Sequence, residues 1–246
     1  ANGTDGLRAY SFDNTAPSPT LGTGNNIDSG GEARGVCLAW YGGARPELAN
    51  GTDGLRQYSY NGSTFTALQN INSGGEATAA DIYTAGSNYW TYLANGTDGL
   101  RIYSQPTSGG AFTELAHVDD GTAYDVRVDG AGSGIFVADG TDGLRFYYYD
   151  EGEGTLTTNY HINDGGTAMG FDYDSNYYFL ANGDDGLRIY SDGGTNFVLA
   201  GHIDSGGEAR KVSIAQINEY IYIFLANGAD GLRVYRVDTP GGGGGE

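Results

Sequence analysis

Apolar and polar residues alternate along the chain in short runs that are typical of β-strands. In one such run, Leu100 to Tyr103, leucine and isoleucine fall on one face of a strand, and arginine and tyrosine fall on the other. Other runs, such as Tyr220 to Ala226, are almost entirely apolar. No segment keeps an apolar period of 3.6 residues, which a helix would require. The pattern therefore predicts an all-β protein made of short strands.

One phrase of eight residues, Ala-Asn-Gly-Thr-Asp-Gly-Leu-Arg with small variations, occurs six times. Its copies occupy residues 1–8, 49–56, 94–101, 138–145, 181–188 and 226–233, and a tyrosine follows two places after each arginine. A second phrase, of which Ile-Asp-Ser-Gly-Gly-Glu-Ala at 203–209 is an example, occurs five times between copies of the first. Such regular self-similarity is the signature of a repeat protein, here with a period of about 45 residues.

Each repeat divides into four predicted strands, which we name A to D. Strand A follows the double glycine (Val212 to Ala215), strand B ends at the first phrase (Tyr220 to Ala226), and strand C begins at its Leu-Arg. Strand D is predicted at Phe65 to Ile71, Phe112 to Val118, Leu156 to Ile162 and Phe197 to Ile203. Four strands in about 45 residues is the size of one propeller blade, so the sequence predicts a five-bladed β-propeller.

The phrase Phe-Leu-Ala-Asn-Gly-x-Asp-Gly-Leu-Arg-Val-Tyr resembles the repeats of bacterial LVIVD-type propellers, and the resemblance spans the whole chain. Those proteins usually have valine-aspartate at the end of this strand, where this chain has tyrosine-serine. The members are surface or secreted proteins of mostly undefined function. The resemblance implies the propeller fold and a location outside the cell or at its surface.

The numbers of predicted strands suggest how the ring closes. The chain holds five copies each of strands A, B and D, but six of strand C. Five blades form if the D strand at about Thr20 to Ile27 joins the C-terminal A, B and C strands, which leaves no open sheet edge. The expected division is then 1–12 as a surplus N-terminal strand, 13–19 as a tether, 20–238 as the propeller and 239–246 as a glycine-rich C-terminal linker.

Charge and composition narrow the expected partners. Lysine and arginine together number 12 against 31 aspartates and glutamates, a formal net charge of −19. Such a surface repels phosphate backbones and anionic lipids, so we expect no nucleic acid as partner. No apolar run reaches the roughly 20 residues that cross a bilayer, so we expect no membrane insertion. The lone cysteine, Cys37, lies in an apolar run and is expected to be a small buried hydrophobe.

An aspartate and an arginine recur in every copy of the turn phrase, and this identity favours a structural role. Catalysis needs one asymmetric site, whereas an architectural turn needs the same residues in every blade. The pairs are Asp53 and Arg56, Asp98 and Arg101, Asp142 and Arg145, Asp185 and Arg188, and Asp230 and Arg233. The turn lacks the acidic ladder and distal glutamate of an EF-hand, so weak binding of Ca²⁺ is the most that we expect, and no other cofactor.

Two further sets of polar residues recur at fixed places. His117, His161 and His202 share one register of strand D, but the outer strands of three blades would hold them too far apart for a zinc site. Strand A of a propeller lines the central channel. The residues at its start are therefore the best candidates for a small-ligand or cation site at the channel mouth: Glu32, Arg34, Glu76, Glu208 and Arg210.

The sequence contains none of the familiar nucleophile, zinc-hydrolase or phosphate-binding motifs, so we expect no enzyme. The surplus strand instead favours an extracellular structural module, a subunit of a surface filament or array that exchanges a terminal strand with copies of itself or with another surface protein. The residues assigned to this assembly are Leu7, Arg8, Tyr10, Leu232, Arg233 and Tyr235. The alternative is a lectin-like propeller that binds a glycan or small ligand at the channel mouth or between blades.

Overall fold

The computed structural model describes residues 1–13, 20–22, 24–28, 30–40, 43–193, 196–218 and 220–238. In these ranges the chain forms β-strands joined by turns, together with one short 3-10 helix, Gly228–Asp230. No helix within them is long and apolar enough to cross a membrane. The expected tether, beyond Asp13, and the C-terminal linker lie outside the described residues.

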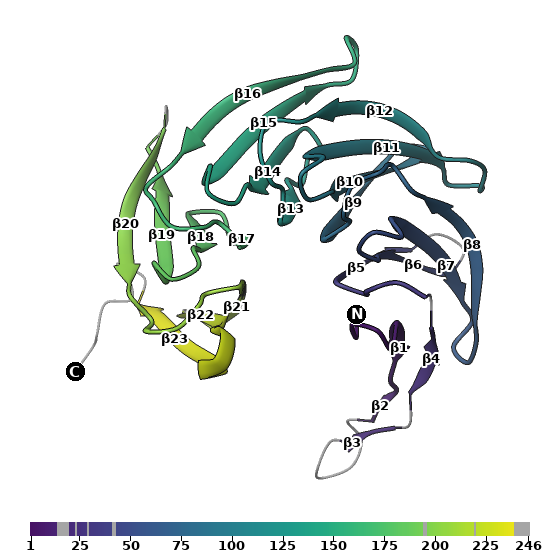
Figure 1. The fold of residues 1–246 in the computed structure, drawn as a ribbon, viewed down its shortest axis with the longest axis horizontal. Coiled ribbons are helices and arrows are strands. Elements are labelled where there is room, and N and C mark those ends of the chain that lie inside the picture. The colour runs from purple at the N-terminus through teal and green to yellow at the C-terminus, as the bar shows by residue number, and fades with distance from the viewer. Residues whose placement is uncertain are drawn as a thin grey trace. The chain divides into compact units, whose positions relative to one another are not determined.

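The fold is a five-bladed β-propeller built from small antiparallel sheets, as the repeat predicts (Figure 1). Four blades have four strands each, in the order A-B-C-D. The first is β5 (Gly35–Trp40), β6 (Ala44–Ala49), β7 (Leu55–Tyr60) and β8 (Phe65–Ile71), and the second is β9 (Ala79–Ala85), β10 (Asn88–Ala94), β11 (Leu100–Pro106) and β12 (Thr113–Val118). The third is β13 (Asp125–Val128), β14 (Gly134–Ala138), β15 (Leu144–Asp150) and β16 (Thr155–Ile162), and the fourth is β17 (Gly170–Tyr173), β18 (Tyr177–Ala181), β19 (Leu187–Asp192) and β20 (Phe197–Ile203).

The fifth sheet has three strands among the described residues: β21 (Lys211–Ile217), β22 (Tyr220–Ala226) and β23 (Leu232–Asp238). These correspond to strands A, B and C of a blade. All seven residues of β22 are paired with β23, from Tyr220 opposite Asp238 to Ala226 opposite Leu232. Within the part of the chain that the structure describes, no strand D completes this sheet.

The N-terminal segment forms a hairpin, and this corrects the expected closure of the ring. Strand β1 (Leu7–Ala9) pairs with β4 (Asn25–Ile27), and β2 (Phe12–Asp13) pairs with β3 (Thr20–Leu21). The expectation that the D strand at Thr20 to Ile27 pairs with the C-terminal strand C was therefore wrong. Residues 1–12 are already paired within their own chain, because closing a short local hairpin costs less entropy than joining segments some 200 residues apart.

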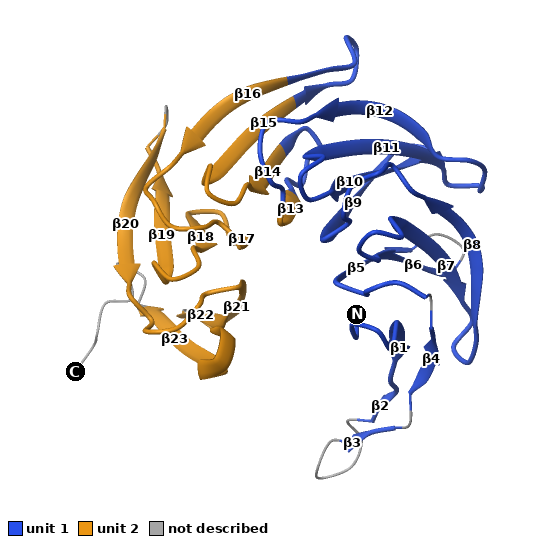
Figure 2. Ribbon diagram, in the orientation of Figure 1, with its two compact units in different colours: residues 1–123, 128–134, 149–156 blue, residues 124–127, 135–148, 157–246 orange. Residues whose placement is uncertain are grey.

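The chain divides into two compact units, which are coloured separately in Figure 2. One comprises residues 1–123, 128–134 and 149–156, and the other comprises residues 124–127, 135–148 and 157–246. In each unit the core lies between successive blades. In the first, Ala49 and Leu55 pack against Ala80 and Leu93 of the next blade. Strands B and C of one blade thus face strands A and B of the blade that follows.

Candidate functional site

A tight turn with the sequence Asn-Gly-x-Asp-Gly joins strands B and C. In the second blade the amide of Asp98 donates to the carbonyl of Asn95 (3.2 Å), and the amide of Gly99 donates to the carbonyl of Gly96 (3.0 Å). Gly99 has a φ of 74°, and a Cβ on it would lie 2.1 Å from the carbonyl oxygen of Val118 in strand D. Only glycine fits there, because a side chain would collide with backbone that cannot move aside.

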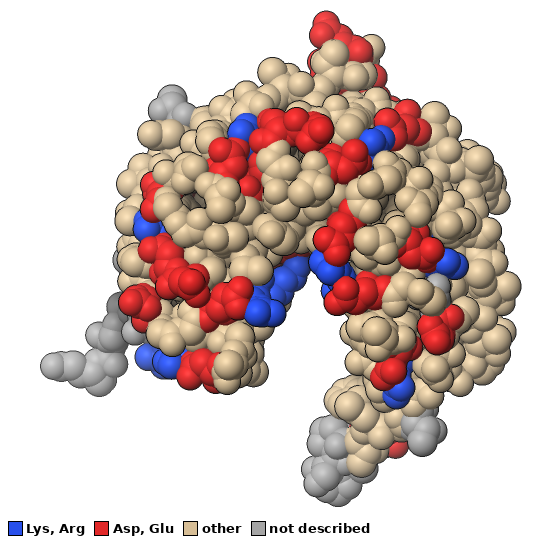
Figure 3. Space-filling view, in the orientation of Figure 1, with Lys and Arg blue, Asp and Glu red and all other residues tan. Residues whose placement is uncertain are grey.

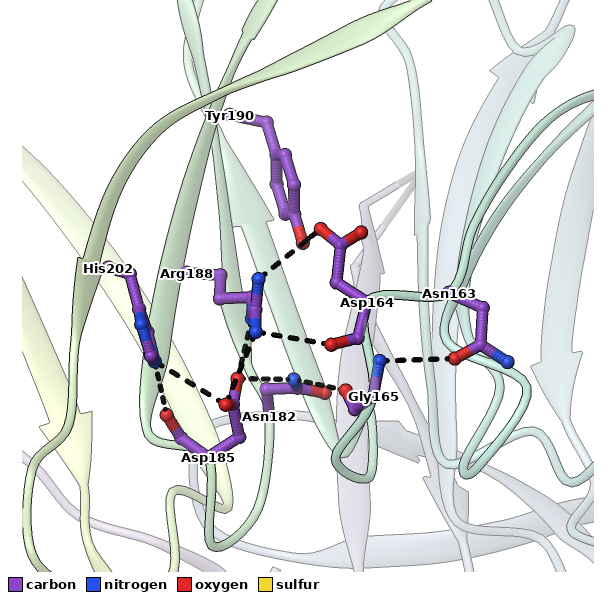
Figure 4. A network of polar contacts seen from close by, with 8 residues as sticks. All are labelled: Asn163, Asp164, Gly165, Asn182, Asp185, Arg188, Tyr190 and His202. Carbon is purple, nitrogen blue, oxygen red and sulfur yellow. Dashed lines mark hydrogen bonds and ion pairs between the residues drawn. The ribbon is translucent and has the colours of Figure 1, made fainter.

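The turn aspartate receives a hydrogen bond from the arginine after it and, in every copy except that of the third blade, where Asp139 replaces the asparagine, from the asparagine before it. In the fourth blade, Asn182 donates to Asp185 over 2.8 Å and the Nε of Arg188 donates over 2.5 Å (Figure 4). Arg188 also donates to the carbonyl of Asp164 (3.2 Å), whose carboxylate accepts from the hydroxyl of Tyr190 (2.8 Å). Because Asp164 lies in the loop that leads into strand A, the network ties that loop to the turn and to strand C.

The strand C arginines are mostly, but not fully, buried in the second, third and fourth blades and are more exposed in the N-terminal hairpin and the fifth sheet. The side chains of Arg101, Arg145 and Arg188 are 14%, 15% and 12% exposed, and those of Arg8 and Arg233 are 40% and 43% exposed. Each pairs with the aspartate three residues earlier, as Arg56 does with Asp53. The hydrogen bond from Arg101 lowers the pKa of Asp98. These contacts make the repeated pair a clamp between turn and strand.

The three histidines lie in separate blades, and each contacts the turn between strands B and C of its own blade. Each Nε2 lies within hydrogen-bond distance of the backbone carbonyl of the turn aspartate: His117 at Asp98 (2.8 Å), His161 at Asp142 (2.5 Å) and His202 at Asp185 (2.7 Å). In the remaining copies Asn70 occupies this register opposite Arg56, and Asn26 occupies it opposite Arg8. Across the described ranges, no group of three histidine, cysteine or acidic side chains could hold a metal ion.

The residues expected at the channel mouth form ion pairs within each unit. Arg34 lies 2.9 Å from Glu32 and 2.6 Å from Glu76, so these three are brought together in the first unit. Glu208 and Arg210 lie 2.6 Å apart in the second unit. Figure 3 shows many acidic side chains on the face drawn, with basic side chains beside many of them. Both Arg34 and Arg210 therefore have a carboxylate as a neighbour.

Aspartates of strand A connect consecutive blades, a feature that the sequence analysis did not identify. The carboxylates of Asp81, Asp125 and Asp172 accept hydrogen bonds from the backbone amides of Val128 (3.0 Å), Phe171 (2.9 Å) and Ile214 (2.9 Å), each on strand A of the next blade. The Nζ of Lys211, the only lysine in the sequence, lies 2.5 Å from the buried carboxylate of Asp125. In the sequence, these contacts could have been predicted from the aspartate that interrupts each of the strands A concerned.

One buried polar network breaks the repeat. Glu47 on β6 occupies the place that an aromatic residue takes in the other blades: Tyr92, Phe136, Phe179 and Phe224. Its carboxyl group accepts hydrogen bonds from Gln57 (2.8 Å) and Thr91 (2.9 Å), and Gln57 exchanges two more with Gln105 (2.7 and 3.0 Å). Burial raises the pKa of Glu47 to about 7. This group, which the sequence analysis also missed, is the most asymmetric chemistry among the described residues.

The residues assigned to assembly differ between the two ends of the chain. Leu7 is buried against Leu48 and Tyr58 of the first blade, and Tyr10 is exposed. At the other end the corresponding Leu232 is exposed, while Tyr235 packs on the core of the second unit. The N-terminal copy of strand C is therefore packed within its own chain, whereas the C-terminal copy has an uncovered apolar face.

Cys37 is half-buried rather than fully buried, with its Sγ 3.9 Å from the carbonyl oxygen of Glu47. It packs at the edge of the core between the first and second blades, as a small apolar residue does.

Comparison with known proteins adds no assignment to this picture. No protein-family model matches the chain, and no curated protein sequence matches it.

Proposed function

We propose that the protein is a non-catalytic structural module that assembles with copies of itself through its terminal strands, as part of an extracellular filament or surface array. Support comes from the repeat, in which an Asp–Arg clamp recurs in every blade, as an architectural element does. The extracellular location rests on the resemblance to surface propellers. The assembly rests on the sixth copy of strand C and on the edge of β23, which pairs with β22 on one side only among the described residues.

The carrying observation is that, among the described residues, the C-terminal sheet has no strand D while the N-terminal hairpin holds a strand D. The C-terminal sheet β21-β22-β23 has strands A, B and C, and the N-terminal hairpin supplies strands C and D as β1 and β4. An unpaired strand edge exposes a row of amide and carbonyl groups, which favours pairing with another chain. Donation of β4 to β23 of a second copy would complete a four-stranded blade and release β1.

The register of this exchange follows from the other blades. In the first, second and fourth blades the leading leucine of strand C lies opposite the residue that ends strand D: Leu55 opposite Ile71, Leu100 opposite Val118, and Leu187 opposite Ile203. Within the N-terminal hairpin, Leu7 lies opposite Ile27 and Arg8 opposite Asn26. After exchange we expect Leu232 of one copy to face Ile27 of the next, with Arg233 facing Asn26.

Disulfide cross-linking between two different chains tests the exchange. One chain carries Asn26→Cys and the other Arg233→Cys, both with Cys37→Ser, and they are mixed at high concentration under mild oxidation. We expect a cross-linked pair that contains one copy of each chain. The matched control replaces Asn25, which lies beside the register position, and should cross-link much less because its side chain points to the opposite face.

Removal of residues 1–27 provides a second test, since it deletes β4 together with its partner. The shortened chain should keep its β-rich circular dichroism spectrum and lose concentration-dependent assembly in analytical ultracentrifugation. An intact chain that stays monomeric at every concentration, and whose two cysteine variants never cross-link between chains, would refute the assembly function.

A polar cleft in the first unit favours a second candidate, the binding of a small hydroxylated ligand such as a sugar. The cleft encloses about 420 Å³ and is lined by Arg45, Gln57, Gln69 and Gln105, with Gly110 beside them. Arg45 has no carboxylate partner among the described residues, so its guanidinium is available to a ligand. We expect saturation-transfer NMR with a panel of neutral and acidic monosaccharides to give signals that Arg45→Ala abolishes, with Arg236→Ala as the control.

A further inference from the structure

The junction between the first and second blades, which lies within the first unit, carries polar side chains at positions that are apolar in the other blades. Glu47 takes the place of an aromatic residue, and Gln57 is buried beside it on strand C. The counterparts of Gln57 are Ile102, Phe146, Ile189 and Val234. The other blades form without these polar groups, so the fold itself does not require them. Their concentration at one junction indicates a role that the other junctions do not share.

These side chains form one row across the first blade. Glu47 lies opposite Gln57 where β6 pairs with β7, and Gln57 lies opposite Gln69 where β7 pairs with β8. Opposed residues of neighbouring strands share a face of the sheet, so the row runs from the buried Glu47 to the half-buried Gln69. Arg45 precedes Glu47 by two residues on β6 and therefore lies on the same face.

The second blade completes the row from β11 and from the loop that follows it. The Nε2 of Gln105 donates to the Oε1 of Gln57 (3.0 Å) and to the carbonyl of Gly110 (2.8 Å). The Nε2 of Gln69 donates to the same carbonyl (2.5 Å). A Cβ on Gly109 would lie 3.9 Å from the Nη1 of Arg45, so the loop passes beside the guanidinium. Both blades thus hold the walls of the cleft of about 420 Å³ in place.

The charge of Arg45 is not neutralised within the part of the chain that the structure describes. Nine of the other ten arginines pair with a carboxylate, and Arg236 lies over the ring of Tyr220. Arg45 is half-buried and has no such partner among the described residues. In a chain with 31 acidic residues, this leaves a guanidinium fork open to an external carboxylate, which it can bind through two parallel hydrogen bonds.

The remainder of the cleft suits a hydroxylated ring. The Oε1 of Gln69 receives no hydrogen bond from the described residues, so it can accept one from a ligand hydroxyl. Leu68, which is 43% exposed, offers an apolar wall to the C–H face of a sugar. One guanidinium balances one negative charge, and the net charge of −19 disfavours a dianion such as phosphate more than a monoanion.

We propose that the cleft binds a sugar that carries a carboxylate, with Arg45 holding the carboxylate and Gln69 accepting from a hydroxyl group. This inference rests on the second candidate function, ligand binding in this cleft, and names the class of ligand. Gln57 and Gln105 are positioning residues, because both hydrogens of each side-chain amide are already donated within the protein.

Titration of the full chain with matched sugars, followed by protein NMR, tests the ligand class. Glucuronate and galacturonate should bind at least about tenfold more tightly than glucose and galactose, which lack the carboxylate. Arg45→Gln should lower the affinity for the acidic sugars to that for the neutral ones, and Arg45→Lys should keep part of the preference because it keeps the charge. Gln69→Leu should weaken both classes of sugar alike. Arg236→Gln is the matched control and should change neither.

Small anions separate a site for acidic sugars from a general anion site. Acetate and inorganic phosphate should each bind at least about tenfold more weakly than the acidic sugars, and equally tight binding of either anion would overturn the proposal. If acidic and neutral sugars bind equally and Arg45→Gln changes neither, the proposal is overturned while sugar binding in the cleft stands. If no sugar binds at all, the second candidate function fails together with it. The circular dichroism spectrum of Arg45→Gln should match that of the wild type, since Arg45 makes no ion pair within the described residues.

Discussion

At the scale of single residues, the departures from the repeat carry more information than the repeated positions. The turn aspartate and strand C arginine are present in every copy and form the same clamp each time. Glu47 stands alone, because its carboxyl replaces a buried aromatic ring and recruits Gln57 and Thr91 as partners. A buried carboxyl group is costly when ionised, so this one position ties the stability of the first unit to pH.

Glu47→Gln is expected to stabilise the protein at neutral and alkaline pH. Burial raises the pKa of Glu47 from 4.5 to about 7, so between these values the folded protein binds more protons there than the unfolded chain does. Its contribution to stability is therefore present below pH 4.5 and is lost as the pH rises through 7. Glutamine stays neutral, accepts from Gln57 and donates to Thr91. Urea denaturation should show a gain of about 3 kcal/mol at pH 8 and a much smaller gain at pH 5.

Thr91→Val is the companion variant, since it removes a donor to the carboxyl without removing the charge. It should lower stability at both pH values, and more at pH 8 than at pH 5, because the hydrogen bond from Thr91 favours the ionised carboxylate and lowers the pKa of Glu47. Equal stability of Glu47→Gln and wild type at pH 8 would contradict a buried carboxyl with a raised pKa.

At the scale of elements, the turn between strands B and C has nearly the same sequence in every repeat, but its neighbours differ from one blade to another. In the second blade, Arg101 is held by both oxygens of Asp98 and by Glu114 of strand D (2.6 Å). In the fifth sheet, the same turn has Arg233 and Asp230 exposed. A charge pair away from solvent loses more when one partner is removed, because the remaining charge stays poorly hydrated.

Asp98→Asn should therefore destabilise the protein more than Asp230→Asn, although both change the same turn. We expect a loss of about 1–2 kcal/mol for Asp98→Asn at pH 7, measured by urea denaturation. The pKa of Asp98 is lowered in the folded state, chiefly by the hydrogen bond from Arg101, so its contribution is present above the unfolded pKa and is lost on acidification through the folded one. The difference from wild type should shrink below pH 3. If Asp98→Asn and Asp230→Asn lowered stability equally, the burial of the Asp–Arg pair would have no influence on its contribution.

At the scale of the whole molecule, the described residues place strands C and D in the N-terminal hairpin and strands A, B and C in the fifth sheet. Its net charge of −19 opposes association of identical copies, so backbone pairing and apolar burial must supply the driving force. The proposed assembly should accordingly strengthen when salt screens the charges. Sedimentation of the wild-type chain at low and high ionic strength measures this directly, and assembly that weakens with salt would point to an ionic interface instead.

The sequence alone determined the blade and its turn. Strands Phe65–Ile71, Phe197–Ile203 and Tyr220–Ala226 have the predicted bounds, because alternation of side chains and obligatory glycines are local properties that a repeat displays several times over. The Asp–Arg partnership follows the same logic, since residues three apart across a tight turn meet wherever the turn forms.

Only the tertiary structure decided which strand pairs with β4. Residues 1–8 and 226–233 are nearly identical, so the pattern cannot distinguish the two candidate C strands, and the entropy of a short hairpin decides in favour of β1. The buried carboxyl of Glu47 was equally invisible, because burial depends on which neighbour a strand receives. Hydropathy places an apolar side chain on a face of a strand, but the packing of other blades decides whether that face is covered.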